Sequence, residues 1–205
     1  MILTYHNHSD TVVVVLHEIY GVNQHIKNVC ERLSEVGYDV VCPDLVGKDE
    51  RYSYDQEDIA YKNFMNVGFM QVADNARFTL RQLRTIYSTV YVVGYRVGAT
   101  TAWLCGAEPG LVDALVAYYG SRIRDYLGMQ PQCPSLLLLP IQETSFNVDE
   151  VIAKLREKVN VSVHKYDGLH GFADPQNHNY SELASRQAFD DTIRFFSNIS
   201  KSLLD

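Results

Sequence analysis

The chain has 205 residues, 46% of them hydrophobic and 21% charged, which predicts one globular domain spanning residues 1–205. The formal net charge of −7 excludes nucleic acid or an anionic membrane as the main partner, because both need a cationic surface. The four cysteines show no paired spacing, and no basic region with a signal core opens the sequence. We therefore expect a reduced, cytoplasmic protein without a metal site or a cofactor.

Apolar runs of strand length recur along the chain. Near-continuous runs such as VVVVL and SLLLL are typical of parallel strands that are covered on both faces. The predicted strands cover residues 11–17, 39–42, 90–93, 114–118, 135–139 and 161–166.

Segments with helical periodicity alternate with these strands. They cover residues 23–37, 56–64, 66–86, 98–108, 147–159 and 180–199. This alternation predicts an α/β fold with a mostly parallel central sheet and helices on both faces. The longest polar connection, residues 46–56, is a candidate lid or pocket wall, and a solvated loop fits it equally well.

Chemically useful side chains follow the strand ends, where parallel sheets bind their ligands. Glu18 follows the first long strand, Glu143 the fifth and His170 the sixth. After the third strand, GYRVGA predicts a sharp turn into a helix, with Arg96 where an α/β-hydrolase carries its nucleophile. Elbow, acid and histidine follow one another in the chain order of an α/β-hydrolase triad.

The glycines beside Arg96 fit such a nucleophile elbow. Gly94 and Gly98 leave room for a strained turn that pushes side chain 96 toward the substrate, although tight helix–strand packing would also explain them. In an elbow the amide of Val97 points at the developing oxyanion. The second amide comes from the loop after the first strand, near Ile19.

Several motifs together resemble the dienelactone hydrolase family of α/β-hydrolases. LHEIYGVNQHI, GYDVVCPDL, VVGYRVG, VDALVAYYG and GLHGFAD carry the likeness, which spans nearly the whole chain apart from a shortened amino-terminal hairpin. The resemblance implies a hydrolase of carboxylic esters or lactones, in which a cysteine at the elbow attacks the carbonyl. It also implies that His170 and Glu143 complete the triad, that Glu18 lies beside the nucleophile, and that Tyr61 lines the pocket.

The chain departs from the family pattern at the nucleophile. Arg96 stays protonated and cannot accept an acyl group, so the triad is degenerate. The family's substrate-binding arginines fall on Glu57 and Asp174, two acidic residues that would repel an anionic lactone. Ser121, which follows the fourth strand, is an alternative nucleophile that lacks the elbow geometry.

Three functions are compatible with these residues. The first is a weak esterase in which His170 and Glu143 activate water, and the second is a pseudoenzyme that binds a small anionic molecule around Arg96. The third is an interaction protein that keeps the fold for its surface, and either a monomer or a homodimer is expected. The sequence also predicts that Arg96 pairs with Glu18, with Glu143 as second choice, because a confined guanidinium needs a carboxylate.

Overall fold

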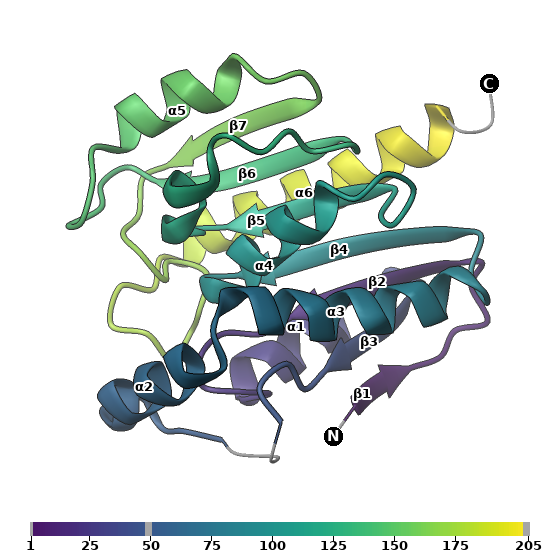
Figure 1. The fold of residues 1–205 in the computed structure, drawn as a ribbon, viewed down its shortest axis with the longest axis horizontal. Coiled ribbons are helices and arrows are strands. Elements are labelled where there is room, and N and C mark those ends of the chain that lie inside the picture. The colour runs from purple at the N-terminus through teal and green to yellow at the C-terminus, as the bar shows by residue number, and fades with distance from the viewer. Residues whose placement is uncertain (1, 48–50, 203–205) are drawn as a thin grey trace.

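The computed structural model describes residues 2–47 and 51–202, and a seven-stranded sheet forms the centre of this part (Figure 1). Its strands are β1 (Ile2–Tyr5), β2 (Thr11–Leu16), β3 (Asp39–Pro43), β4 (Thr89–Tyr95), β5 (Ala114–Tyr118), β6 (Ser135–Pro140) and β7 (Val161–Tyr166). They lie in the order β1-β3-β2-β4-β5-β6-β7, and every neighbouring pair is parallel except β1 with β3. The carboxyl ends of β2 to β7 therefore meet at one edge, on the left of Figure 1. The predicted fold is confirmed.

The edge strand β1 is missing from the sequence prediction. It pairs antiparallel with β3, with Leu3 opposite Cys42, and does not form a hairpin ladder with β2. Its four residues alternate between exposed and half-buried, and so short a half-exposed segment gives little periodic signal. The six predicted strands are all present, with ends within two residues of those expected.

The described chain has six α-helices, which cover both faces of the sheet. They are α1 (Gln24–Glu35), α2 (Glu57–Val67), α3 (Phe69–Arg84), α4 (Val97–Gly106), α5 (Val148–Arg156) and α6 (Glu182–Ser202). In Figure 1, α3 and α4 lie in front of the sheet while α1 and α6 lie behind it. The predicted continuous helix over residues 66–86 is wrong in one respect. Gly68 adopts a φ of +82°, which ends α2 and separates it from α3.

Strand β2 shows why both faces are covered. Val12, Val14 and Leu16 belong to the core on the side of α3 and α4, while Val13 and Val15 belong to the core on the side of α1 and α6. Successive side chains of a strand point to opposite faces, so a continuous apolar run needs an apolar layer on each side. The run VVVVL therefore reflects a central strand of a doubly covered sheet.

Residues 48–50 of the polar connection 46–56, the candidate lid or pocket wall, lie outside the described ranges. Its described end is held close to the sheet edge, since the amide of Tyr52 donates a hydrogen bond to the carbonyl of Tyr20 at 3.2 Å. The short 3₁₀ helix η1 (Tyr54–Gln56) then leads into α2. Chain from this connection thus borders the strand ends where the site is expected.

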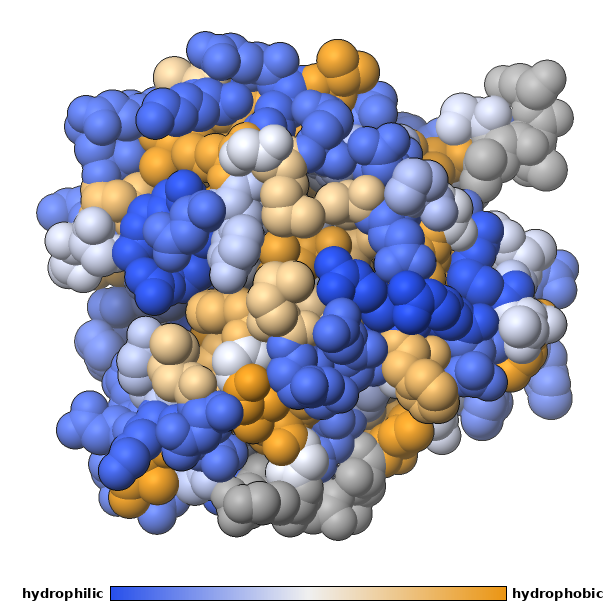
Figure 2. All heavy atoms as spheres, viewed as in Figure 1, coloured by the Kyte–Doolittle hydropathy of each residue, from blue (hydrophilic) through white to orange (hydrophobic). Residues whose placement is uncertain are grey.

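The outer surface mixes hydrophobic and hydrophilic residues. On the face shown in Figure 2, hydrophobic side chains are scattered among hydrophilic ones. The exposed hydrophobic residues of the molecule include Phe78 and Ile86. Among the helices of residues 2–47 and 51–202, none combines the length and the apolar character that crossing a membrane requires.

Candidate active site

The predicted elbow is present between β4 and α4. Arg96 has φ 51° and ψ −111°, a conformation that costs energy for any residue with a side chain. Its amide donates to the carbonyl of Tyr118 at 3.1 Å, and its carbonyl accepts from the amide of Thr100 at 3.2 Å. These bonds hold the strained residue between the neighbouring strand and the first turn of α4.

The two glycines of the elbow are required by contact distances. A Cβ on Gly94 would lie 2.2 Å from the carbonyl oxygen of Gly98, and one on Gly98 would lie 2.1 Å from that of Leu16. No real Cβ approaches a backbone atom so closely, so any other residue would push α4 away from β2 and β4. The elbow and the close helix–strand packing are therefore one feature, and the two explanations of the glycine spacing agree.

The acid and the histidine of the predicted triad meet at the same sheet edge. Nδ1 of His170 lies 2.7 Å from Oε1 of Glu143, whose side chain is only 5% exposed. The carbonyl of His170 accepts a hydrogen bond from Nδ2 of Asn179 at 2.9 Å, and the imidazole contacts the ring of Tyr119. A carboxylate at Nδ1 fixes the ring in the orientation that a catalytic histidine needs.

Arg96 forms the predicted ion pair with Glu18. Its Nε lies 3.4 Å from Oε1 of Glu18, and the side chains are 11% and 0% exposed. The pairing with Glu18 is thus confirmed, whereas Glu143, the second choice, is engaged by His170. Burial raises the pKa of Glu18 to about 7, and the nearby guanidinium of Arg96 opposes this rise. The pair occupies the position at which a nucleophile would stand.

A buried group that the sequence analysis missed lies against this pair. Nε2 of His25 is 4.0 Å from Glu18, and its Nδ1 is 3.9 Å from Asp174. Burial lowers the pKa of His25 to about 4. Asp174 is fully buried and accepts hydrogen bonds from the Tyr54 hydroxyl and the Gln176 amide. The expectation that Asp174 faces the substrate is therefore corrected, because its carboxylate is turned into the protein toward these donors.

Glu18, His25 and Asp174 are also the described residues best placed to hold a cation, since one ligand atom from each lies within 4.8 Å of the others. The guanidinium of Arg96 already supplies a positive charge beside Glu18. His25 turns a different ring nitrogen toward each carboxylate, whereas a metal would use only one. This arrangement is that of an internal charge network, and it does not fit a metal site well.

Above the Arg96–Glu18 pair lies a cavity of about 270 Å³. Seven of the predicted site residues line it: Ile19, Glu57, Tyr61, Arg96, Val97, Ser121 and His170. Three further residues of its wall, Arg122, Arg124 and Ser145, were not predicted. A neighbouring cavity of about 440 Å³ contains Glu143 and shares Ser121, Ser145 and His170 with the first.

Arg122 and Arg124 add two positive charges to this wall. Both lie on the short 3₁₀ helix η2 (Ser121–Tyr126), which follows β5. Arg124 donates to the carbonyl of Ser121 and lies over the ring of Phe146, 5.1 Å from its centroid. Arg122 lies 3.3 Å from Asp125, and its buried Nε has no hydrogen-bond partner. Both arginines follow the end of β5 within eight residues, but nothing in their spacing indicates that they reach the cavity.

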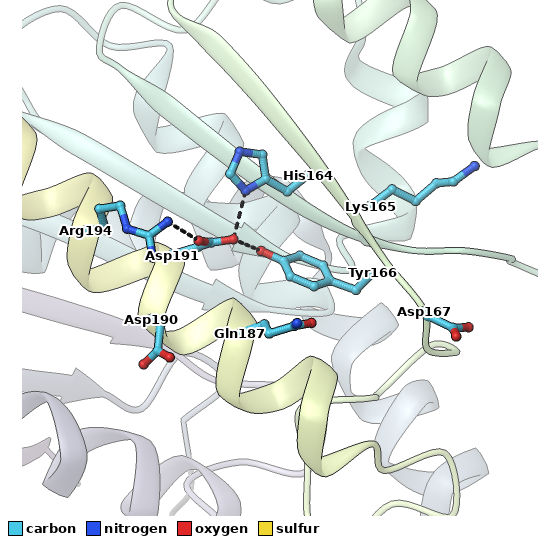
Figure 3. A pocket seen from close by; sticks show the side chains of 8 residues that line it. All are labelled: His164, Lys165, Tyr166, Asp167, Gln187, Asp190, Asp191 and Arg194. Carbon is cyan, nitrogen blue, oxygen red and sulfur yellow. Dashed lines mark hydrogen bonds and ion pairs between the residues drawn. The ribbon is translucent and has the colours of Figure 1, made fainter.

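A larger hollow of about 580 Å³ lies between β7 and α6, away from the predicted site (Figure 3). At its centre, Asp191 bonds to three side chains: Nδ1 of His164 at 3.0 Å, the hydroxyl of Tyr166 at 2.7 Å and Nη1 of Arg194 at 3.0 Å. This carboxylate is satisfied by its own neighbours and ties α6 to the edge strand. We assign it a structural role.

Comparisons with known proteins agree with the fold and the motifs. A family model described as the dienelactone hydrolase family matches residues 2–200. The chain is 39% identical over 196 residues to "Uncharacterized protein YczH" of Bacillus subtilis, covering 94% of each chain. It is 33% identical over 137 residues to a carboxymethylenebutenolidase of Pseudomonas putida, covering 59% of this chain and 55% of that one.

Two solved structures show the same fold. A dienelactone hydrolase-like promiscuous phosphotriesterase from metagenomic libraries matches with a TM-score of 0.71 and 19% identity, over 92% of this chain and 86% of that one. A dienelactone hydrolase from Anabaena variabilis matches with a TM-score of 0.63 and 17% identity, over 89% and 85%. The α/β-hydrolase architecture is thereby established.

Proposed function

The chain belongs to the dienelactone hydrolase family, and from this membership we propose that it is a member with a degenerate triad, which binds a small organic anion at the former active site. One observation carries the proposal. The strained elbow presents Arg96 to a cavity that also contains Arg122 and Arg124. The position that attacks an ester in a working hydrolase here contributes to a cationic pocket.

Hydrolysis is disabled both chemically and sterically in this proposal. A guanidinium keeps its proton at any ordinary pH and forms no acyl-enzyme. Removing the nucleophile of a triad costs on the order of 10⁶ in kcat in a well-studied hydrolase. Arg96 also lines the same cavity as Ile19 and Val97, whose amides would form the oxyanion hole, so its side chain reduces the room for an oxyanion in this proposal.

The arginines around the cavity favour an anion. The wall contains three arginines and one acidic residue, the exposed Glu57. Arg96 is paired with Glu18, and Asp125 lies 3.3 Å from Arg122 and 3.8 Å from Arg124, so these carboxylates balance part of the positive charge. The sequence suggested that Glu57 and Asp174 would repel an anionic ligand. Because Asp174 is buried, Glu57 is the one of these two residues that borders the cavity, and the guanidinium groups of Arg122 and Arg124 offer hydrogen-bond donors to an anion there.

A second candidate is weak hydrolysis by water. It is favoured by the intact contact of 2.7 Å between His170 and Glu143, which would let the imidazole act as a general base. No residue replaces the covalent step in that case, so the rate would be far below that of a family member with a cysteine.

Two assays test the proposal. Hydrolysis of an activated aryl ester is compared between the wild type and His170→Ala, and equal background rates are expected. Melting temperature is then followed against added inorganic phosphate, where a stabilisation that Arg122→Gln reduces is expected. The control is Arg186→Gln, which removes the same charge from an exposed position of α6 outside the cavity. Efficient, His170-dependent turnover together with no phosphate effect would contradict the proposal.

A further inference from the structure

The two cavities at the strand ends adjoin each other, because Ser121, Ser145 and His170 line both of them. We treat them as the two lobes of one site. The arginine lobe measures about 270 Å³ and the neighbouring lobe, which contains the loop after β6, about 440 Å³. Together they exceed what a simple inorganic anion fills, since pockets for small organic ligands have volumes of about 300–1,000 Å³.

The arginine lobe is built to hold a single anionic group. Arg124 is fixed before any ligand arrives, because the Ser121 carbonyl, the Phe146 ring and Asp125, 3.8 Å from its Nε, hold its guanidinium. Arg122 lines the same lobe; its Nη1 lies 3.3 Å from Asp125, and its buried Nε has no hydrogen-bond partner. Guanidinium groups arranged in this way suit the oxygens of a phosphate or a carboxylate.

The neighbouring lobe has the opposite character. Its wall contains the neutral polar side chains of Gln142, Thr144 and Asn179, which offer both donors and acceptors. Its acidic residue is Glu143, whose carboxylate is bonded to His170. A second anionic group placed here would meet this carboxylate in a partly enclosed site, where like charges repel strongly.

From this asymmetry we propose that the ligand is a one-headed anion: a phosphate or carboxylate in the arginine lobe, joined to a neutral hydroxylated or amide-bearing tail in the neighbouring lobe. The inference rests on the proposed anion-binding function and narrows its ligand class. His170, at the junction, would lie beside the bond that joins head to tail.

Binding titrations with three defined probes test the inference. Inorganic phosphate supplies the head alone, glycerol 3-phosphate supplies head and tail, and 1,3-propanediol bisphosphate supplies two heads. We expect glycerol 3-phosphate to bind at least tenfold more tightly than inorganic phosphate, and the bisphosphate to bind no more tightly than inorganic phosphate. Glycerol by itself should not bind.

Variants then assign each part of the ligand to its lobe. Gln142→Ala combined with Thr144→Ala should bring the affinity ratio of glycerol 3-phosphate to phosphate close to one, and both residues are exposed, so the fold tolerates the change. Arg122→Gln should weaken both probes, whereas Arg186→Gln should weaken neither.

The outcomes separate the inference from the proposed function. Equal affinity for inorganic phosphate and glycerol 3-phosphate, or tightest binding of the bisphosphate, would overturn the one-headed ligand while anion binding stands. A complete lack of binding by all three probes would overturn both.

Discussion

Substituting Arg96→Cys tests whether the elbow is a nucleophile position that this chain uses differently. The residue has a φ of 51° and stands at the amino terminus of α4, in a cavity that also contains His170. A helix amino terminus and a neighbouring imidazole both lower the pKa of a thiol. We therefore expect the new cysteine to be exposed to reagent and to ionise readily.

The native cysteines provide an internal reference, because all four are buried. Burial raises the pKa of Cys105 to about 12 and that of Cys133 to about 11. At pH 7 these values leave thiolate fractions of roughly 10⁻⁵ and 10⁻⁴, against about 3% for an unperturbed cysteine. Since the thiolate is the reacting species, Cys at position 96 should alkylate at least about a hundredfold faster than either.

Iodoacetamide labelling followed by peptide mapping measures this ratio directly. Arg96→Ser is the matched control, because it removes the guanidinium without adding a thiol and reports the background labelling of the native cysteines. Equal, slow labelling of all five cysteines in the folded variant would refute the elbow geometry. Labelling at position 96 that is slow at pH 7 and rises only above about pH 8.5, the ordinary thiol pKa, would refute the argument from ionisation.

Three further predictions follow from the same contacts. Wild-type protein should cleave p-nitrophenyl acetate no faster than His170→Ala; a saturable rate lost in that variant would restore the hydrolase interpretation. Gly98→Ala, whose Cβ would lie 2.1 Å from the Leu16 carbonyl oxygen, should destabilise the fold by at least about 3 kcal/mol in urea melts, while Gly128→Ala, with nothing within 4 Å, should have little effect. The pKa of Glu18 is raised from 4.5 to about 7, so its contribution to the unfolding free energy is lost as pH rises from 4.5 to 7. The pKa of His25 is lowered from 6.5 to about 4, so its contribution is lost as pH falls from 6.5 to 4. In the wild type these two pH dependences of the unfolding free energy oppose each other. In Glu18→Gln only that of His25 remains, so the unfolding free energy should rise by up to about 1.4 kcal/mol per pH unit between pH 4 and 6.5. A variant whose unfolding free energy changes with pH in the same way as that of the wild type would contradict the pKa shifts of these two groups.

Signals in the sequence were enough for every strand of the sheet except β1, for the elbow and for the acid–histidine contact. Strands buried on both faces are continuous apolar runs, and a parallel sheet brings all their carboxyl ends to one edge. Side chains that directly follow those ends, such as Glu143 and His170, are therefore brought close together without a prediction of how the loops fold. The Arg96–Glu18 pair was predictable for a similar reason, because a confined guanidinium leaves few choices of partner.

The sequence did not reveal features that depend on how a loop turns after leaving a strand. Asp174 was expected at the pocket wall, but the turn after His170 directs its carboxylate inward to the hydroxyl of Tyr54, which lies 120 positions away in the chain. Arg122 and Arg124 reach the cavity because η2 bends across the strand ends, and their spacing by two residues gives no periodic signal. Such placements are set by tertiary packing, and no local pattern encodes them.

Arg96 is one member of a set of buried charges at the strand ends. Asp174 and Glu18 are both fully buried, and Arg96 lies 3.4 Å from Glu18. Two buried carboxylates beside one guanidinium leave one negative charge without a positive partner, and a proton bound to Glu18 or His25 would neutralise it. Removing Arg96 alone would therefore move protonation of Glu18 to higher pH, because its neutral form avoids a bare buried charge. It follows that Arg96→Cys should supply the reactive thiol without by itself restoring the charges around it, which makes labelling, and not ester turnover, the decisive test of the elbow.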